Sequence, residues 1–340
     1  MSSFTVGLAV IGGLLLAVLV GWNTWTTRRN TPRQAEGAPL GAPRTLEERE
    51  DPVFGPSLFP VLPVVERKPG LDALIDVLTP IALDAPVSGE AALAAIPPTR
   101  RAGSKPFAIE GLNDSTQQWE TPQPGQRYGT FQAGVQLANR TGALNEIEYS
   151  EFVVKVQAFA DAINGSPEFP EMLDEVARAR ELDQFASEHD AQLSFTLRAT
   201  NAAWSPGYVQ QNAARLGFVA GAIPGRMVLP AAAPASYPVL GLSFDTQAAM
   251  ADDPAQSALR SLTLSLDVPQ VHRSEQPFDR MRDAANTLAA AMEGVITDDN
   301  GQPIPAEALD VISADLERLY DTLDARDLAA GSPQARRLFS

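Results

Sequence analysis

Histidine and cysteine carry much of the metal and nucleophilic chemistry of proteins, and this chain has few of them. Its 340 residues include no cysteine and two histidines. His189 and His272 lie in polar sequence, as solvated surface side chains usually do. The absence of cysteine excludes disulfides, thiol catalysis and cysteine-based zinc sites. We therefore expect no catalytic residue and no metal site.

Two further kinds of motif could bind a cation or a phosphate group. The run Asp298-Asp299-Asn300-Gly301 lacks the alternating ligands and closing Glu of a calcium loop. Its Asn-Gly pair instead predicts a hairpin turn. The three lysines are scattered, and no Gly-x-Gly-x-x-Gly motif follows a predicted strand. We expect no cofactor and no enzymatic activity.

The N-terminal segment Phe4–Trp22 is apolar and contains no charge. At ~1.5 Å per residue, a helix of this length spans roughly 28 Å, enough to cross a bilayer. A cleaved signal peptide is the alternative, but it needs a basic start and a small-residue cleavage site. Neither is present, so the segment predicts a single transmembrane helix, with the lipid bilayer as its partner.

The residues that follow this helix predict its orientation. Arg28, Arg29 and Arg33 come directly after Trp22 and Trp25, and basic residues accumulate on the cytoplasmic side of membrane helices. We therefore expect the N-terminus in the periplasm and the rest of the chain in the cytoplasm. Ala9 and Gly13 form a small-xxx-small pair, which keeps self-association through the helix as an alternative.

The formal net charge of −16 restricts the partners of the soluble part. Residues 1–51 contain as many acidic as basic side chains, so the whole excess lies beyond them. Such an acidic module binds nucleic acid poorly and is repelled by anionic lipid. We expect no nucleic-acid partner.

Composition divides the chain into five regions. Residues 1–29 form the anchor and its basic exit, and 30–70 form a Pro/Gly-rich tether that cannot bury enough apolar surface to order itself. Two modules follow at 71–188 and 191–328, and residues 329–340 are expected to be a flexible tail.

Hydrophobic periodicity in the two modules predicts an α+β fold of antiparallel sheets with helices on one face. The expected strands are 74–83, 107–112, 130–137, 193–199, 218–223, 239–244 and 262–268. The expected helices are 90–96, 150–163, 170–187, 206–216, 277–292 and 305–323. The order of elements occurs twice, which favours two tandem related domains.

Several stretches resemble one family. Residues 262–270, 277–281 and above all 294–304 are similar to the FtsZ-binding domain of the ZipA family, which tethers the bacterial division ring to the inner membrane. Residues 21–29 resemble the aromatic and basic exit of that family's N-terminal helix. The resemblance covers roughly residues 191–325 and the first 30; it does not explain 71–188.

The resemblance implies a split β-α-β fold, with an open groove on the sheet face away from the helices. In relatives, that groove receives the C-terminal tail of FtsZ through mostly apolar contacts. Strand alternation then assigns Leu193, Phe195, Leu197, Leu264 and Leu266 to the helix face. The partner-binding residues expected in the groove are Thr196, Ile223, Phe244, Thr246, Thr263 and Ser265. Phe244 and Ile223 should then be exposed.

This chain departs from the family in one respect, because Thr246 and Ser265 stand where relatives place large apolar residues. The resemblance implies a single-pass inner-membrane protein of cell division and septum assembly that binds FtsZ. One alternative is a membrane-anchored adaptor of the same fold with a different ligand. The other is a membrane-anchored enzyme that uses residues 71–188, for which the sequence offers no constellation of reactive side chains.

Overall fold

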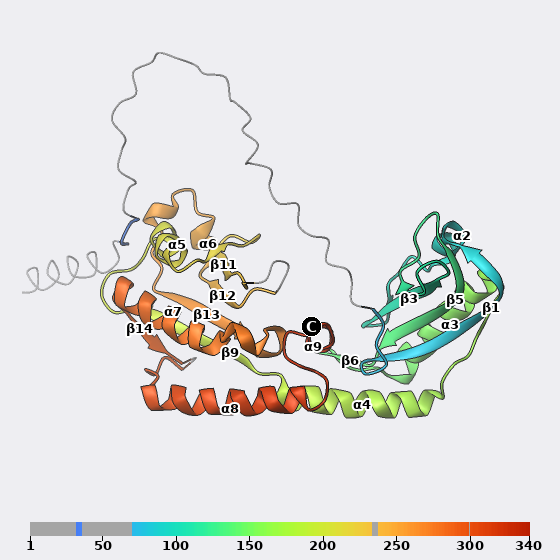
Figure 1. Cartoon of the computed structure of the whole chain (residues 1–340). Coiled ribbons are helices and arrows are strands. Elements are labelled where there is room, and N and C mark those ends of the chain that lie inside the picture. Colours follow the sequence, from blue (N-terminus) through green and yellow to red (C-terminus); the bar gives the residue numbers. More distant parts are fainter. Residues whose placement is uncertain (1–31, 36–69, 233–236, 299) are drawn as a thin grey trace, which may run out of the picture. The chain divides into compact units, whose positions relative to one another are not determined.

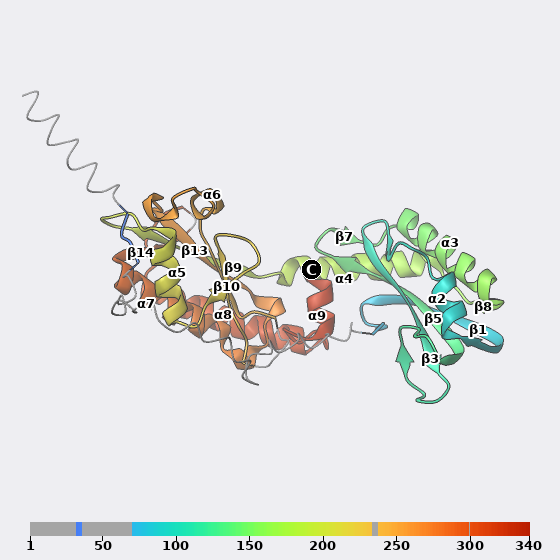
Figure 2. The same ribbon diagram turned by 90° about the horizontal axis from the view of Figure 1, so that it is seen from above.

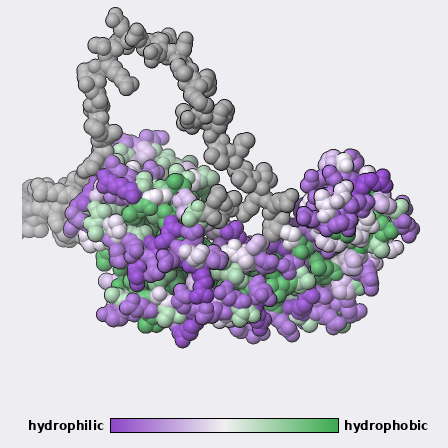
Figure 3. All heavy atoms as spheres, viewed as in Figure 1, coloured by the Kyte–Doolittle hydropathy of each residue, from purple (hydrophilic) through white to green (hydrophobic). Residues whose placement is uncertain are grey.

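The computed structural model describes residues 32–35, 70–232, 237–298 and 300–340 (Figure 1). The chain forms two compact units. Of the described residues, the first unit comprises 70–191 together with 317–340. The second unit comprises 192–316 together with 32–35. Hydrophilic residues predominate on the visible faces of both, in keeping with the net charge (Figure 3).

The first unit is an antiparallel sheet with the strand order β2-β3-β5-β1-β8, and β4 pairs with β3 outside this path. A small hairpin, β6–β7, follows β5. The elements are β1 (Asp76–Ser88), α2 (Gly89–Ala95), β2 (Arg101–Ala102), β3 (Lys105–Asn113), β4 (Trp119–Glu120), β5 (Arg127–Gln136), β6 (Ala138–Asn139), β7 (Gly142–Ala143), α3 (Glu146–Ile163), β8 (Gly165–Pro167) and α4 (Met172–His189).

Helix α3 covers one face of this sheet (Figures 1 and 2). The rings of Phe131 and Phe159 meet edge to face, with centroids 5.3 Å apart, which fixes the helix on β5. The helix begins at Asn145, which forms a capping box with Glu148. It ends at Asn164 in the left-handed conformation, the usual stop signal of a helix.

The opposite face of the first sheet is partly covered by the chain's own C-terminal segment, which contains α9 (Pro333–Leu338). The Arg337 guanidinium pairs with the fully buried carboxylate of Asp76. The side-chain amide of Gln136 donates to the Arg337 carbonyl over 2.7 Å.

The prediction of a flexible tail over 329–340 is therefore wrong. Ser332 caps α9 and Pro333 occupies its first turn. Leu338 and Phe339 are then buried, with 0% and 1% of their surface exposed. The C-terminal segment is thus ordered by the burial of its apolar side chains and by the Arg337–Asp76 ion pair, although its sequence has no periodic apolar pattern.

The second unit is an antiparallel sheet with the strand order β10-β11-β12-β13-β9-β14. Its elements are β9 (Gln192–Ala199), α5 (Pro206–Arg215), β10 (Val219–Ala220), β11 (Arg226–Leu229), β12 (Leu240–Ser243), α6 (Thr246–Ala249), β13 (Ser261–Asp267), α7 (Pro277–Met292) and β14 (Gly294–Thr297). Short 3-10 turns lie at Pro254–Gln256, Val268–Gln270 and Arg273–Glu275. Helix α8 (Ala306–Asp324) begins in this unit, and its residues from 317 are assigned to the first.

The two units share a strand order. The run β3-β5-β1-β8 of the first sheet corresponds to β12-β13-β9-β14 of the second, and both sheets are antiparallel throughout. Helices α3 and α7 hold the same place in this order, each directly before an edge strand. The expected α+β class with antiparallel sheets is confirmed, and the strand order is the one that a tandem repeat requires.

The predicted transmembrane segment Phe4–Trp22 lies outside the described residues. Within the described residues, none of the helices combines the length and the apolar character needed to cross a bilayer.

Candidate protein-binding face of the second unit

The register of β9 and β13 separates two faces of the second sheet. Thr263 lies opposite Thr196, and Leu264 lies opposite Phe195. Residues directly opposite each other in an antiparallel pair project to the same face. The ring of Phe195 contacts Phe278 of α7, so the leucine side is covered by that helix. The threonine side is the face away from α7, called the open face below.

The predicted helix-face residues agree with this arrangement. Phe195, Leu197, Leu264 and Leu266 are buried, and Leu193 is half-buried. Alternation along β9 and β13 therefore places the apolar residues as expected.

The centre of the open face is made of small side chains. β12 continues the rows of β13, with Gly241 opposite Ser265 and Ser243 opposite Thr263. A Cβ atom at Gly241 would stand 2.6 Å from the Ser265 hydroxyl, so a side chain at this position would displace that hydroxyl. The centre consists of hydroxyl-bearing residues and one glycine, namely Ser194, Thr196, Gly241, Ser243, Thr263 and Ser265. It is a shallow polar surface.

The rim of the open face carries apolar and cationic residues. Val219 pairs with Val228, which pairs with Gly241, so both valines share this face; Val219 is 48% exposed. Arg226 lies opposite Ser243, and Arg198 lies opposite Ser261. Both arginines are exposed, and neither forms an ion pair with a described residue. The valine pair and Arg226 thus flank the hydroxyl centre on the side of β11, and Arg198 flanks it on β9.

Three of the six predicted partner-binding residues lie together on this face. Thr196 and Thr263 are direct neighbours and half-exposed, and Ser265 is exposed two residues further along β13. Their partner-binding role stays a prediction.

The other three predicted residues lie elsewhere. Ile223 is 52% exposed in the turn between β10 and β11. Thr246 is exposed at the first position of α6. Phe244 is only 7% exposed, so the expectation of an exposed aromatic ring is wrong. The cause is the strand register: Gly241 and Ser243 lie on the open face, so alternation places Leu242 and Phe244 on the side of α7. The Phe244 N–H donates to the Gly225 carbonyl, which continues the pairing of β12 with β11 by one residue.

Four further residues of the open face were not among the predicted partner-binding residues, and the sequence pattern could have identified only some of them. Ser194 follows from alternation along the predicted strand that contains Thr196, whereas Ser243 is placed only by its pairing with Thr263. Val228 and Arg226 belong to β11, a strand of four residues with no predicted counterpart. Their place on the face depends on pairing with β12, which only the folded chain reveals.

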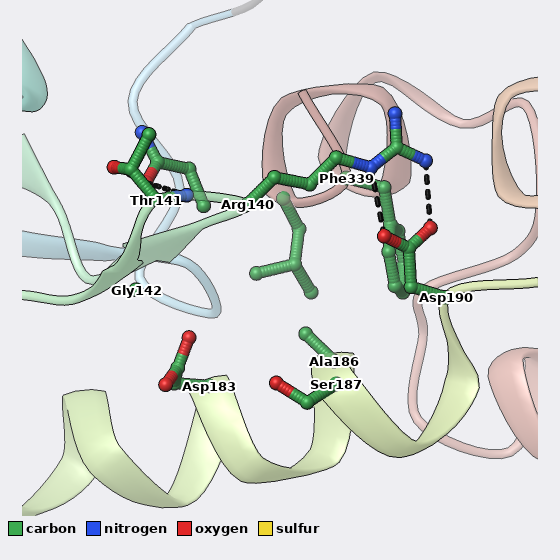
Figure 4. A pocket seen from close by; sticks show the side chains of 10 residues that line it. Arg140, Thr141, Gly142, Asp183, Ala186, Ser187, Asp190 and Phe339 are labelled. Atoms are coloured by element: carbon green, nitrogen blue, oxygen red, sulfur yellow. Dashed lines mark hydrogen bonds and ion pairs between the residues drawn. The ribbon is translucent and has the colours of Figure 1, made fainter.

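The enzyme alternative depends on the first unit, where one pocket of about 430 Å³ lies between the β6–β7 hairpin, α4 and the C-terminal segment (Figure 4). Arg140 reaches Asp190 through two hydrogen bonds of 2.8 and 2.6 Å. Asp183 is the other carboxylate in the lining. Because Asp190 is already paired, this pocket presents no pair of converging carboxylates for acid–base chemistry.

Comparison with known families gives one match. Residues 248–315 match the family described as ZipA, C-terminal FtsZ-binding domain. The match covers β13, α7 and β14, and it confirms the resemblance to the ZipA family for this part of the second unit. A search of curated proteins found no match to the chain.

Proposed function

We propose that the second unit binds the C-terminal tail of FtsZ on its open face, and that the chain holds FtsZ filaments at the inner membrane. One observation carries the proposal: the family match includes β13, the strand that contributes Thr263 and Ser265 to the centre of that face. The chain acts as a tether in septum assembly and catalyses no reaction.

The second unit is the better candidate because the corresponding face of the first unit is already occupied. The side chain of Leu71 lies directly against Gly134: a Cβ atom built at Gly134 would stand 2.5 Å from a methyl group of Leu71. Arg337 and Gln136 link the C-terminal segment to the neighbouring row of that sheet. A partner peptide would have to displace these contacts, whereas Ser265 of the second unit is exposed.

The chemistry of the open face indicates how a tail would bind. A sheet face offers side chains and few free main-chain groups, so the serine and threonine hydroxyls supply the hydrogen bonds. The exposed Val219 and its neighbour Val228 supply apolar contact at one rim. Arg226 and Arg198 attract carboxylates, which an otherwise acidic protein would repel.

The membrane part of the proposal depends on the charge-free segment Phe4–Trp22 and the arginines behind it. In this topology the N-terminus is periplasmic and both units are cytoplasmic, where FtsZ assembles.

Sedimentation with proteoliposomes tests the tethering function. The full chain, reconstituted in vesicles, should bring FtsZ into the vesicle fraction and should leave tail-less FtsZ in solution. Thr263→Arg places a long side chain at the centre of the open face and should reduce capture at least ~10-fold. The matched control is Val311→Arg, at a 61%-exposed position on α8. Equal capture of full-length and tail-less FtsZ would contradict the proposal.

The hydroxyl-lined centre also favours a second candidate, an adaptor of the same fold with a different ligand. In that case vesicles carrying the full chain would not capture FtsZ at all. Pull-down from cytoplasm would then recover a partner that Thr263→Arg releases and Val311→Arg retains.

A further inference from the structure

A short segment near the start of the predicted tether is paired with the second unit. The Arg33 N–H donates to the Ala203 carbonyl over 2.7 Å, and the Ser205 N–H donates to the Arg33 carbonyl over 2.8 Å. These bonds form a parallel bridge between Arg33 and Trp204, and Trp204 forms an antiparallel bridge with Leu259 on its other side. Residues 32–35, called the strap below, therefore add an edge to existing strand-like structure.

The Arg33 side chain strengthens this pairing. Its guanidinium lies 2.6 Å from the Glu293 carboxylate, at the end of α7. The hydrogen bond from Arg33 lowers the pKa of Glu293, with a smaller contribution from Asn201. The Glu293 carboxylate therefore stays ionised to a lower pH than it would without Arg33.

The strap pairs with the main chain of a residue, Trp204, whose side chain lies in the core of the second unit. Trp204 is fully buried, and its indole N–H donates to the Met292 carbonyl over 2.9 Å. Ser205 caps α5 through its side chain. The strap thus binds a surface whose geometry is set by packing, not by the strap itself.

We propose that this surface is a docking site for the chain's own strap, and that it fastens the FtsZ-binding unit directly behind the membrane helix. About 10 residues separate Trp22 from Pro32, a reach of at most ~35 Å at full extension. Without docking, the described chain would begin at Gly70, about 48 residues after Trp22, and the limit would be roughly 160 Å. Docking therefore keeps the second unit close to the membrane surface. This consequence rests on the proposed membrane topology, whereas the docking itself does not.

Engineered cysteines test the docking, because the natural chain has none to interfere. A Cβ atom built at Gly207 would lie 3.8 Å from the Ala35 Cβ, and among the described residues outside its own turn of α5 no other atom lies within 4 Å of it. This separation suits a disulfide. The full chain carrying Ala35→Cys and Gly207→Cys should close a disulfide on mild oxidation, read by mass spectrometry of the linked peptides. The control pair is Ala35→Cys with Ser261→Cys, an exposed position on β13.

The docking predicts that the first pair closes at least ~10-fold faster than the control pair. Adding Arg33→Pro removes the N–H that bonds Ala203 and should slow closure about fivefold. Arg33→Glu should also slow it, and Arg33→Glu with Glu293→Arg should restore it. Closure no faster than in the control pair, or a rate unchanged by Arg33→Pro, would overturn the proposal. No FtsZ is present, so failure here is distinct from failure of tail binding.

Discussion

At the residue scale, Phe244 is part of the core although it directly follows a strand of the candidate site. Its N–H bonds the Gly225 carbonyl next to β11, and its ring lies on the buried side of β12 together with Leu242. Thr196, Thr263 and Ser265 could be placed from sequence because each lies inside a strand with clear alternation. Phe244 could not, because the face that each residue of the four-residue strand β12 presents depends on its pairing with β13.

Phe244→Ala should therefore destabilise the second unit. Truncating a buried phenylalanine costs typically about 3–5 kcal/mol, through lost apolar burial and the cavity that remains. Ile223→Ala, at a position 52% exposed, should change the free energy of unfolding by less than ~1 kcal/mol. Urea unfolding of the full chain, followed by tryptophan fluorescence, measures both. Equal stability of the two variants would contradict the burial of Phe244.

The ion pair of Asp76 and Arg337 predicts a second residue-scale effect. Asp76 has no exposed surface, and Arg337 has a side chain only 17% exposed. Arg337→Ala leaves a buried charge unpaired and should cost about 3–5 kcal/mol. Arg282→Ala breaks an exposed pair with Asp279 and should cost about 0–1 kcal/mol. Chemical denaturation at pH 7 compares the two.

The same variant should show a distinctive pH dependence. Burial raises the pKa of Asp76, and Arg337 opposes this rise. Without Arg337, the folded state favours the protonated carboxyl more strongly than the unfolded chain does. The penalty of Arg337→Ala should therefore shrink near pH 4 and grow as pH rises through the folded-state pKa. A penalty that grows on acidification would show that the carboxylate is not buried without its partner.

At the scale of elements, long periodic segments could be predicted and short ones could not. The expected helix at 277–292 matches α7, which begins at Pro277 and ends before Glu293 in the left-handed conformation. The expected strand at 218–223 is reduced to β10, because Gly221, Pro224 and Gly225 form a turn. Strands β8 and β14 have three and four residues, too few for a detectable period.

Helix α9 gives an element-scale prediction. Ending the chain at Ser332 removes buried Ala335, Leu338 and Phe339 as well as the Arg337 pair. Amide hydrogen exchange of β1 and β5 should then accelerate strongly, because their sheet face loses its cover. Exchange of β9 and β13, in the other unit, serves as the internal control and should stay unchanged. Unaltered exchange in β1 and β5 would restore the interpretation of a flexible tail.

At the scale of the whole molecule, the two sheets share a strand order, and their faces away from the helices differ. In the first unit that face carries Asp76 with its C-terminal partner; in the second it carries exposed hydroxyls. This supports the proposal of a tandem duplication in which one copy came to bind its own chain. The order of elements was detectable from sequence, but the occupied face was not, because its partner lies 261 residues away along the chain.

Membrane topology is also a whole-molecule prediction. A green fluorescent protein fused after Ser340 should fluoresce, and alkaline phosphatase at the same point should be inactive, because the arginines after Trp22 favour the cytoplasm. The reverse pattern would exclude contact with FtsZ and with it the proposed function.

Titration of the full chain in nanodiscs with a labelled FtsZ tail peptide tests the central claim most directly. Fluorescence anisotropy should show saturable binding to the natural chain and to Val311→Arg. Thr263→Arg should weaken binding at least ~30-fold, equivalent to about 2 kcal/mol, with an unchanged melting temperature because its side chain points to solvent. Val219→Glu at the apolar rim should weaken it by a smaller factor. Binding that is unaffected by Thr263→Arg, in a chain that melts normally, would place the FtsZ site away from the open face and contradict the account.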